Sequence, residues 1–340
     1  MTQSGMIAHM ETSLKRTPGS AAWCARLLRS TAADILPLVS AALGSAADLP
    51  AGAPRSVMHE FVQEHPHGAF LGAVVLQSKE DMERSLRAVA DFVDAIITLF
   101  ESTTSAVLSS MALTRASGEA VARFCHLHDP NQPPAQTIAR MVAVQLLAVE
   151  DNLRTAEAFG EHGRDDAEKA TGKIREIHKR LTDNGFHRTR AKREVFTANI
   201  SLGGAVENLS FNATDAFKKY VKVGSWEWAL GSGAVHTRAW LLPNLVGTFK
   251  EPPFMDRDEV ARFVALALLE LATAFATSIG GHCGFDPDPY LKKIHQRRVA
   301  VSAIDNPEGG QAVGHREYGE RQVSPVFPHG TEGASFIGAA

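Results

Sequence analysis

The chain has 340 residues, of which 44% are hydrophobic and 21% are charged, and its formal net charge is −3. This composition allows a substantial core, and the small net charge gives no global signal for nucleic-acid or membrane binding. The three cysteines, Cys24, Cys125 and Cys283, are far apart and lack CxxC spacing. A disulfide framework or a zinc site is therefore not expected, and a reducing cytosol fits best.

No segment predicts a membrane span. The apolar run near the N-terminus is interrupted by Arg26, Arg29 and Asp34, so it lacks the charge-free centre of a signal peptide. Residues 263–281 are more apolar, but Glu270 lies at their centre, where a charge disfavours insertion into a bilayer. We expect a soluble, cytoplasmic protein that does not contact a membrane.

Helical spacing of apolar residues dominates the chain. Residues 80–112 repeat them at i, i+3 and i+4, which predicts one buried helical stripe. A proline pair at 133 and 134 and a stop at Gly160 predict the next helix. In residues 164–183 acidic side chains come early and basic ones late, which complements the dipole of a helix at both ends. The Asn-Gly pair that follows is typical of a left-handed cap at the C-terminal end.

Near the C-terminus, Asp256 and Glu259 resemble a capping box that opens a helix closing at the glycine pair 280–281. A short helix is expected after Pro289. Strand-like runs are few: residues 70–77 and 195–202 are the candidates, each of which could also be irregular or part of a small hairpin.

The predicted fold class is all-α, a multi-helix bundle or array with disordered N- and C-terminal tails. Both ends of the chain lack apolar periodicity, and the C-terminal end is rich in Gly, Pro, Ser and His. We divide the chain into a flexible tail (1–19), an N-terminal helical portion (20–77), a main helical bundle (78–300) and a second flexible tail (301–340).

One candidate site lies in the segment RASGEAVARFCHLHDP, residues 115–130. Arg115, Glu119 and Arg123 are spaced i, i+4, i+8, so they can form a charged ladder along one helix. On a solvated face such a ladder contributes little to stability. Facing the interior, it would form a polar seam whose charges must neutralise one another. Both interpretations stay open.

A second candidate lies in SWEWALGSGAVHTRAWLLP, residues 225–243. Ser232 and His236 fall within about one helical turn, among tryptophans and small residues that leave room for a ligand to reach the imidazole. The alternative is a core histidine that donates a hydrogen bond to a facing carbonyl.

These two segments together resemble a pattern in uncharacterised helical proteins of actinobacteria. In that pattern an Arg/Glu helix ends in an aromatic-leucine-aspartate-proline corner, and a later helix carries a serine-glycine-histidine turn. The resemblance covers roughly residues 80–245. More distantly, the chain resembles the HEPN-like helical proteins of toxin–antitoxin and abortive-infection systems.

The HEPN resemblance implies a metal-independent ribonuclease in which a histidine helps to activate a ribose hydroxyl and an arginine holds the phosphate. Arg123 and His128 fit the spacing of the HEPN motif and are the candidate catalytic pair. Arg180 with His187 fits equally, and two matches are no more than chance predicts. The motif usually has a polar residue directly after its arginine, whereas this chain has phenylalanine and leucine at those positions.

A local basic segment covers residues 173–193, with eight Lys/Arg against two acidic residues. Such a density can attract phosphate backbones despite the acidic total; a solvated helix face with acidic partners elsewhere in the chain is the alternative. The residues we would assign to RNA guidance are Lys179, Arg180, Arg188, Arg190 and Arg193.

Motifs for metals and nucleotides are absent from the sequence: it has no HExxH, CxxC, GxSxG or glycine-rich loop after a strand. We therefore expect no metal and no cofactor.

Two functions remain, and we favour the first. The chain is either a non-catalytic helical module that binds a partner protein or a small ligand around Arg115, Glu119, Ser232 and His236, or a HEPN-like ribonuclease of a defence system. In both cases we expect a homo-oligomer, dimeric through a helix face.

Overall fold

The computed structural model describes residues 20–45, 49–102, 107–221 and 257–303. In these residues the chain is predominantly α-helical, with a single small sheet of three strands, which confirms the predicted fold class. The N-terminal tail and most of the C-terminal tail that we predicted lie outside the described residues. Residues 301 and 302, which we assigned to the tail, belong to a helix, and Val301 is buried.

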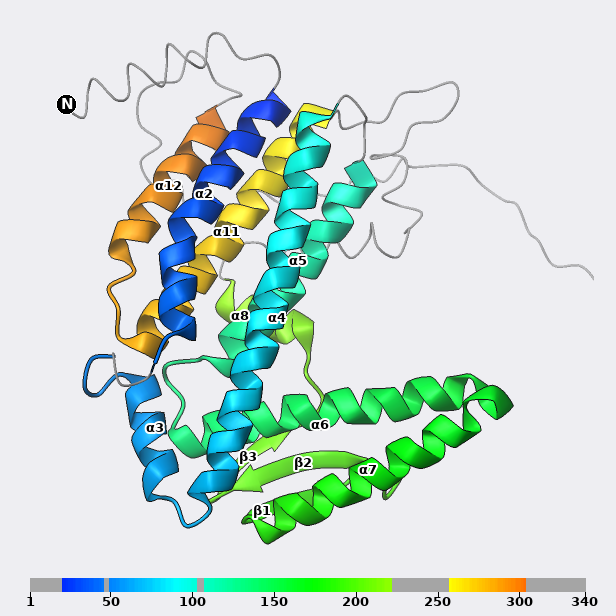
Figure 1. The fold of residues 1–340 in the computed structure, drawn as a ribbon. Helices are drawn as coiled ribbons and strands as arrows, with labels where there is room; N and C mark the ends of the chain where they lie inside the picture. Colours follow the sequence, from blue (N-terminus) through cyan, green and yellow to red (C-terminus); the bar gives the residue numbers. More distant parts are fainter. Residues whose placement is uncertain (1–19, 46–48, 103–106, 222–256, 304–340) are drawn as a thin grey trace, which may run out of the picture. The chain divides into compact units, whose positions relative to one another are not determined.

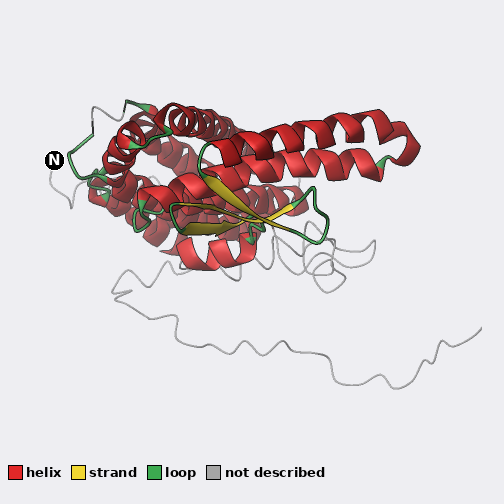
Figure 2. Cartoon of the chain, turned by 90° about the horizontal axis from the view of Figure 1, so that it is seen from below, coloured by secondary structure: helices red, strands yellow, loops and turns green. Residues whose placement is uncertain are grey.

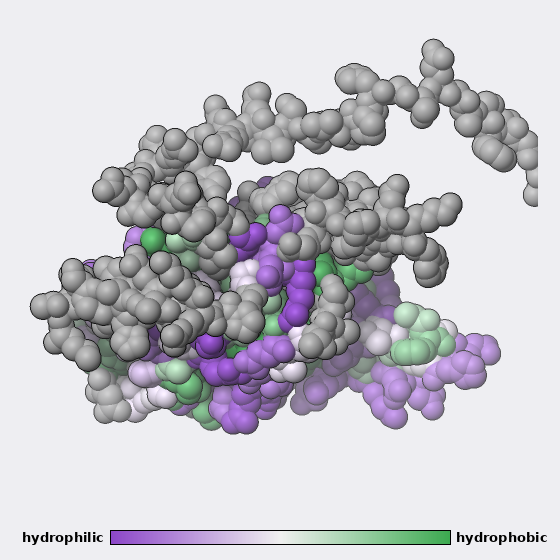
Figure 3. Space-filling model, turned by 90° about the horizontal axis from the view of Figure 1, so that it is seen from above, coloured by the Kyte–Doolittle hydropathy of each residue, from purple (hydrophilic) through white to green (hydrophobic). Residues whose placement is uncertain are grey.

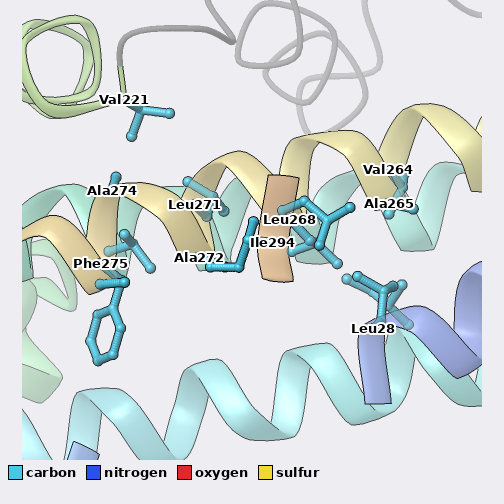
Figure 4. Close-up of a cluster of buried hydrophobic side chains, with 14 of the residues drawn as sticks. Leu28, Val221, Val264, Ala265, Leu268, Leu271, Ala272, Ala274, Phe275 and Ile294 are labelled. Carbon is cyan, nitrogen blue, oxygen red and sulfur yellow. The ribbon is translucent and has the colours of Figure 1, made fainter. Parts of the chain in front are cut away.

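Five helices run side by side in the larger part of the fold (Figure 1). They are α2 (Ser20–Leu43), α4 (Gly68–Glu101), α5 (Val107–Leu127), α11 (Arg257–Cys283) and α12 (Asp288–Ser302). Helix α11 packs against α2, α5 and α12. It is apolar around most of its circumference, which is the pattern of a helix enclosed by others. Figure 4 shows Leu28 of α2 and Ile294 of α12 beside Leu268 of α11.

Helix α11 is the one helix among the described residues that is long and apolar enough to cross a membrane. In the fold, however, 72% of its most apolar stretch is buried, and Glu270 forms an ion pair with Arg298 of α12. A core helix of a protein without membrane spans passes the same test of length and composition. On the face seen in Figure 3, hydrophilic surface surrounds separate hydrophobic patches.

Side chains from other helices cap both ends of α2. Asp258 of α11 accepts hydrogen bonds from the backbone N–H groups of Ser20 and Ala21, at 3.2 and 3.0 Å. At the other end, Arg55 donates to the carbonyls of Ala42 and Gly44, both at 2.6 Å. An acid at the N-terminus and a base at the C-terminus both oppose the charge of the helix dipole. These contacts therefore fix α2 against α11 and α3 (Pro54–Glu64).

A second group of elements continues from the lower end of α4 in Figure 1. Helices α6 (Pro134–Ala158) and α7 (Arg164–Asp183) form a hairpin through a 3₁₀ turn, Gly160–Gly163. An antiparallel sheet, β1 (Phe186–Arg190), β2 (Thr197–Leu202) and β3 (Ala205–Asn208), lies against this hairpin (Figure 2). Phe186, Ile200 and Leu202 bury their side chains in a second core with residues of α4 and α6. Helix α8 (Ala213–Tyr220) then returns to α5.

The structure confirms the helices expected from the proline pair and from the charge order of residues 164–183. Gly185 has a φ of +82°, the left-handed conformation expected after α7. Strand β2 confirms the candidate at 195–202, but the candidate at 70–77 was wrong, because these residues lie inside α4. The boundary that we drew at 77/78 also falls inside α4.

Two helix ends differ from the prediction. The stripe at 80–112 belongs to two helices, since α4 ends at Glu101 and α5 begins at Val107. Helix α11 continues to Cys283 and is followed by Gly284 at a φ of +72°. Gly280 and Gly281 stay helical and allow a close approach, because a Cβ on Gly281 would lie 2.8 Å from Pro130.

Candidate functional site

Arg123 and His128 lie on different sides of the end of α5. Five residues along a helix correspond to a rotation of about 140°, so the two side chains leave the axis in different directions. The Arg123 side chain is exposed, with its guanidinium 5.0 Å from the ring centre of Phe211. His128, in contrast, is only 7% exposed. The structure therefore does not bring the predicted catalytic pair into one groove.

The His128 ring is held by its neighbours. Its Nδ1 donates a 2.9 Å hydrogen bond to the carbonyl of Phe124, and the ring stacks on that phenyl ring at 4.4 Å. On another side it meets His282 of α11 edge-on, with 5.0 Å between ring centres. Burial, assisted by the positive charge of Arg55, lowers the pKa of His128 to about 4. The imidazole is thus neutral at physiological pH, with its lone pair on Nε2.

His128 and His282 line a small, partly open cavity of about 50 Å³. Its other walls come from α2, α3, α4 and α6 and are mainly apolar; its titratable lining residues are Arg55, Lys79, His128, His282 and Cys283. Nδ1 of His282 is buried and has no hydrogen-bond partner among the described residues. Burial is the main cause of a pKa of His282 well below its usual value, followed by electrostatic interaction with the His128 ring and with the positive charge of Arg55. No residue of the basic segment 173–193 lines this cavity.

Arg115 and Glu119 form the i, i+4 ion pair that their spacing predicted. The closest nitrogen and oxygen are 3.4 Å apart, and the Glu119 side chain is 47% exposed. The Arg115 side chain is only 16% exposed, but its partner carboxylate reaches solvent. A helix pair in contact with solvent on one side contributes less than about 1 kcal/mol. Arg123, one turn further along α5, lies over Phe211. This pairing agrees with a structural role for Arg115 and Glu119.

Acidic partners offset much of the basic segment. Lys179 pairs with Asp183 at 2.9 Å, Arg190 pairs with Glu194, and Arg193 contacts both oxygens of Glu157 at 2.8 and 2.6 Å. The other two residues that we assigned to RNA guidance are held by neutral groups. Arg180 lies 5.9 Å from the ring of Phe70, and Arg188 donates to the carbonyl of Glu194.

Two of these partners, Glu157 and Glu194, lie outside the segment 173–193. A charge count along that segment alone therefore overstates its positive potential, since the fold adds negative charge to the same surface.

Asp129, which the sequence reasoning did not select as a site residue, is the centre of a buried polar cluster. Only 5% of this residue is exposed. Its carboxylate accepts hydrogen bonds from the Lys219 ammonium at 2.9 Å, the Tyr220 hydroxyl at 3.0 Å and the Asn131 backbone N–H at 3.1 Å. The fragment HDP predicts only a helix-ending corner. The partners from α8 are about 90 residues away, and no local pattern indicates them.

A second polar cluster adjoins the first. Glu207 of β3 accepts hydrogen bonds from Gln136 at 2.6 Å and from Arg140 at 3.3 Å, and its other oxygen lies 3.1 Å from Nε2 of His126. Arg140 also donates to the carbonyl of His126 at 2.7 Å. These contacts join the end of α5, the start of α6 and the sheet. Their role is to hold elements together, because each charge meets a partner within the cluster.

The apex of the α6–α7 hairpin displays an aromatic side chain. Phe159 is 67% exposed, although phenylalanine usually contributes to a core. The turn behind it is closely fitted: Gly160 has a φ of +60°, and a Cβ on Gly163 would lie 1.9 Å from the carbonyl oxygen of Ala156. A shallow hollow of about 400 Å³ beside the phenyl ring includes His162. The rest of its lining is Asn152, Thr155, Ala156, Phe159, Gly163 and Asp166.

Ser232 and His236 lie outside the described residues. Within the described ranges, no three His, Cys, Asp or Glu side chains are grouped so that they could hold a metal ion. Comparisons with protein-family models, with curated proteins and with solved structures found no match.

Proposed function

We propose that this chain is a non-catalytic helical module that binds a partner protein through the apex of the α6–α7 hairpin. The observation that carries the proposal is the exposure of Phe159 on a closely fitted turn. Aromatic side chains supply large contact areas at low entropic cost and are enriched at the centre of protein interfaces. The charges near this apex are mixed, because Glu161 pairs with Arg164 at 3.3 Å and Asp166 with Lys169 at 3.6 Å. We therefore expect the partner to bind the phenyl ring in an apolar pocket with a polar rim.

The placement of His128 supports a non-catalytic role. A general base in RNA cleavage must reach the ribose hydroxyl within about 3 Å, directly or through one water. His128 is buried and its Nδ1 is bonded to a backbone carbonyl, while Arg123 faces outwards over Phe211. A second protomer would not repair this arrangement, because an arginine from outside would still have to reach a buried imidazole.

Incubation of the purified protein with total RNA, with and without EDTA, tests the non-catalytic part of the proposal. We expect an unchanged RNA profile for the wild type and for Arg123→Ala and His128→Ala variants. EDTA-resistant cleavage that disappears in both variants would favour the ribonuclease alternative.

Site-specific photo-crosslinking tests the binding part. A benzoyl-phenylalanine at position 159 should form a covalent adduct with one protein in cells of the source organism. Excess wild-type chain should compete with this adduct, and excess Phe159→Ser chain should not. The matched control is the same probe at Leu36, which is 59% exposed on α2. Identical adducts from positions 159 and 36 would contradict a specific role for the hairpin apex.

A further inference from the structure

The cavity around His128 and His282 has the features of a ligand site that is separate from the hairpin. We propose that it binds a small monovalent anion of about the size of chloride. This inference does not depend on the proposed partner protein, because Phe159 and the hollow beside it share no lining residue with the cavity.

The charges of the cavity wall are of one sign. Arg55 of α3 and Lys79 of α4 both line the cavity, and no aspartate or glutamate among the described residues does. The Arg55 guanidinium is fixed in place by the carbonyls of Ala42 and Gly44. At low dielectric a fixed cation acts strongly over a few ångströms. The cavity therefore has a positive potential, and the same charge of Arg55 contributes to the lowered pKa values of both histidines.

His282 supplies an unused polar atom in this wall. The residue is 4% exposed, and its Nδ1 has no hydrogen-bond partner in the described part of the chain. Buried polar groups nearly always have a partner, in the protein or in solvent. With its proton on Nδ1, a neutral His282 would donate a hydrogen bond to an anion in the cavity. A water molecule could accept the same bond, but its binding would not depend on the charge of Lys79.

The size and the remaining walls narrow the class of anion. About 50 Å³ is far below the roughly 300 Å³ at which pockets begin to hold organic ligands. Met58, Met82 and Met141 form much of the wall and donate no hydrogen bonds. Ser78 adds one hydroxyl donor to those of Arg55, Lys79 and His282. Phosphate and sulfate are larger than chloride and carry four oxygens that need donors or solvent, so burying them here would cost more. A small monovalent anion with weak hydration loses less hydration energy on burial and needs fewer hydrogen-bond donors, so it fits this cavity best.

Thermal unfolding in sodium chloride, compared with sodium gluconate at the same ionic strength, tests the proposal in solution. Gluconate is too large for the cavity, so general salt effects cancel. We expect chloride to raise the Tm of the wild type by about 2–4 °C relative to gluconate. The difference should be absent in Lys79→Met and retained in Lys79→Arg. Arg84→Met is the control for loss of a charge on the same helix, because Arg84 is 65% exposed and pairs with Glu80 and Asp81.

Crystals grown in sodium bromide provide a direct test that needs no variant. A bromide anomalous peak inside the cavity, within hydrogen-bond distance of Nδ1 of His282, would support the proposal. A cavity that holds only water in bromide would overturn it, as would a chloride effect that is equal in the wild type and in Lys79→Met.

Discussion

Nζ of Lys219 lies 2.9 Å from Oδ2 of Asp129, and this contact joins α8 to the corner that follows α5. The Tyr220 hydroxyl donates to the same oxygen. Burial by itself would raise the pKa of Asp129, but the hydrogen bonds of Lys219, Asn131 and Tyr220 outweigh it and bring the pKa down to about 2. The carboxylate is therefore charged in the folded protein at any pH above this value, and its partners depend on that charge.

We expect Asp129→Asn to lower the free energy of unfolding by about 2 kcal/mol, because a charged acceptor of several hydrogen bonds becomes neutral in a buried place. Urea denaturation at pH 7 followed by circular dichroism measures the loss. The control is Asp183→Asn, since Asp183 is 54% exposed and pairs with Lys179 on the surface of α7. That substitution should cost less than about 1 kcal/mol, and equal losses in the two variants would refute a structural role for the Asp129 cluster.

The sequence predicts the helices of this protein better than its buried polar clusters. Helices α6 and α7 are predicted well because their ends depend on local signals, prolines at the start and an Asn-Gly pair at the end. Residues 70–77 were misassigned because their apolar run has no clear period. In the fold these residues pack against both α3 and α6, so the helix is apolar on more than one side.

The candidate site could not be predicted in the same way. The surroundings of His128 depend on His282, which is 154 positions away, and those of Asp129 on Lys219 and Tyr220, about 90 positions away. Sequence spacing on α5 showed that Arg123 and His128 are close along the chain. It did not show which side of the helix faces the core, because that depends on where α11 packs.

The buried histidines predict a loss of stability in mild acid. The pKa of His128 is lowered from 6.5 to about 4 in the folded state, and that of His282 is also lowered well below its usual value. Between pH 6.5 and pH 5 the unfolded chain therefore binds more protons than the folded one, and the free energy of unfolding falls as the pH falls. His128 alone should account for about 2 kcal/mol over this interval. Urea denaturation at several pH values measures the slope.

The His128→Gln variant should show a smaller slope than the wild type, although its stability at pH 7.5 also changes. His178, whose pKa burial lowers to about 4, and His282 should account for the slope that remains. His187→Gln is the control, because that side chain is exposed on β1. A wild-type stability that is constant from pH 7 to pH 5 would contradict burial of neutral imidazoles.

Two glycines of the α6–α7 hairpin should respond to alanine in opposite ways. A Cβ at position 163 would lie 1.9 Å from the carbonyl oxygen of Ala156, so the turn must open to accept it. We expect Gly163→Ala to lower the free energy of unfolding by about 1–3 kcal/mol, the usual cost of forcing atoms into a filled place. Gly172 lies in α7 with nothing within 4 Å of its added Cβ, so Gly172→Ala should raise stability by about 0.5–1 kcal/mol through helix propensity.

Amide hydrogen exchange then shows whether the effect of Gly163→Ala is local. Faster exchange should be confined to the end of α6 and the start of α7, because the turn joins only these two helices. The same variant should also weaken the photo-crosslink from position 159, since the orientation of Phe159 depends on this turn. If both the exchange around the turn and the adduct stay unchanged, the turn can accept the added Cβ without opening. The close packing at Gly163 would then not be needed to hold Phe159 in its exposed position.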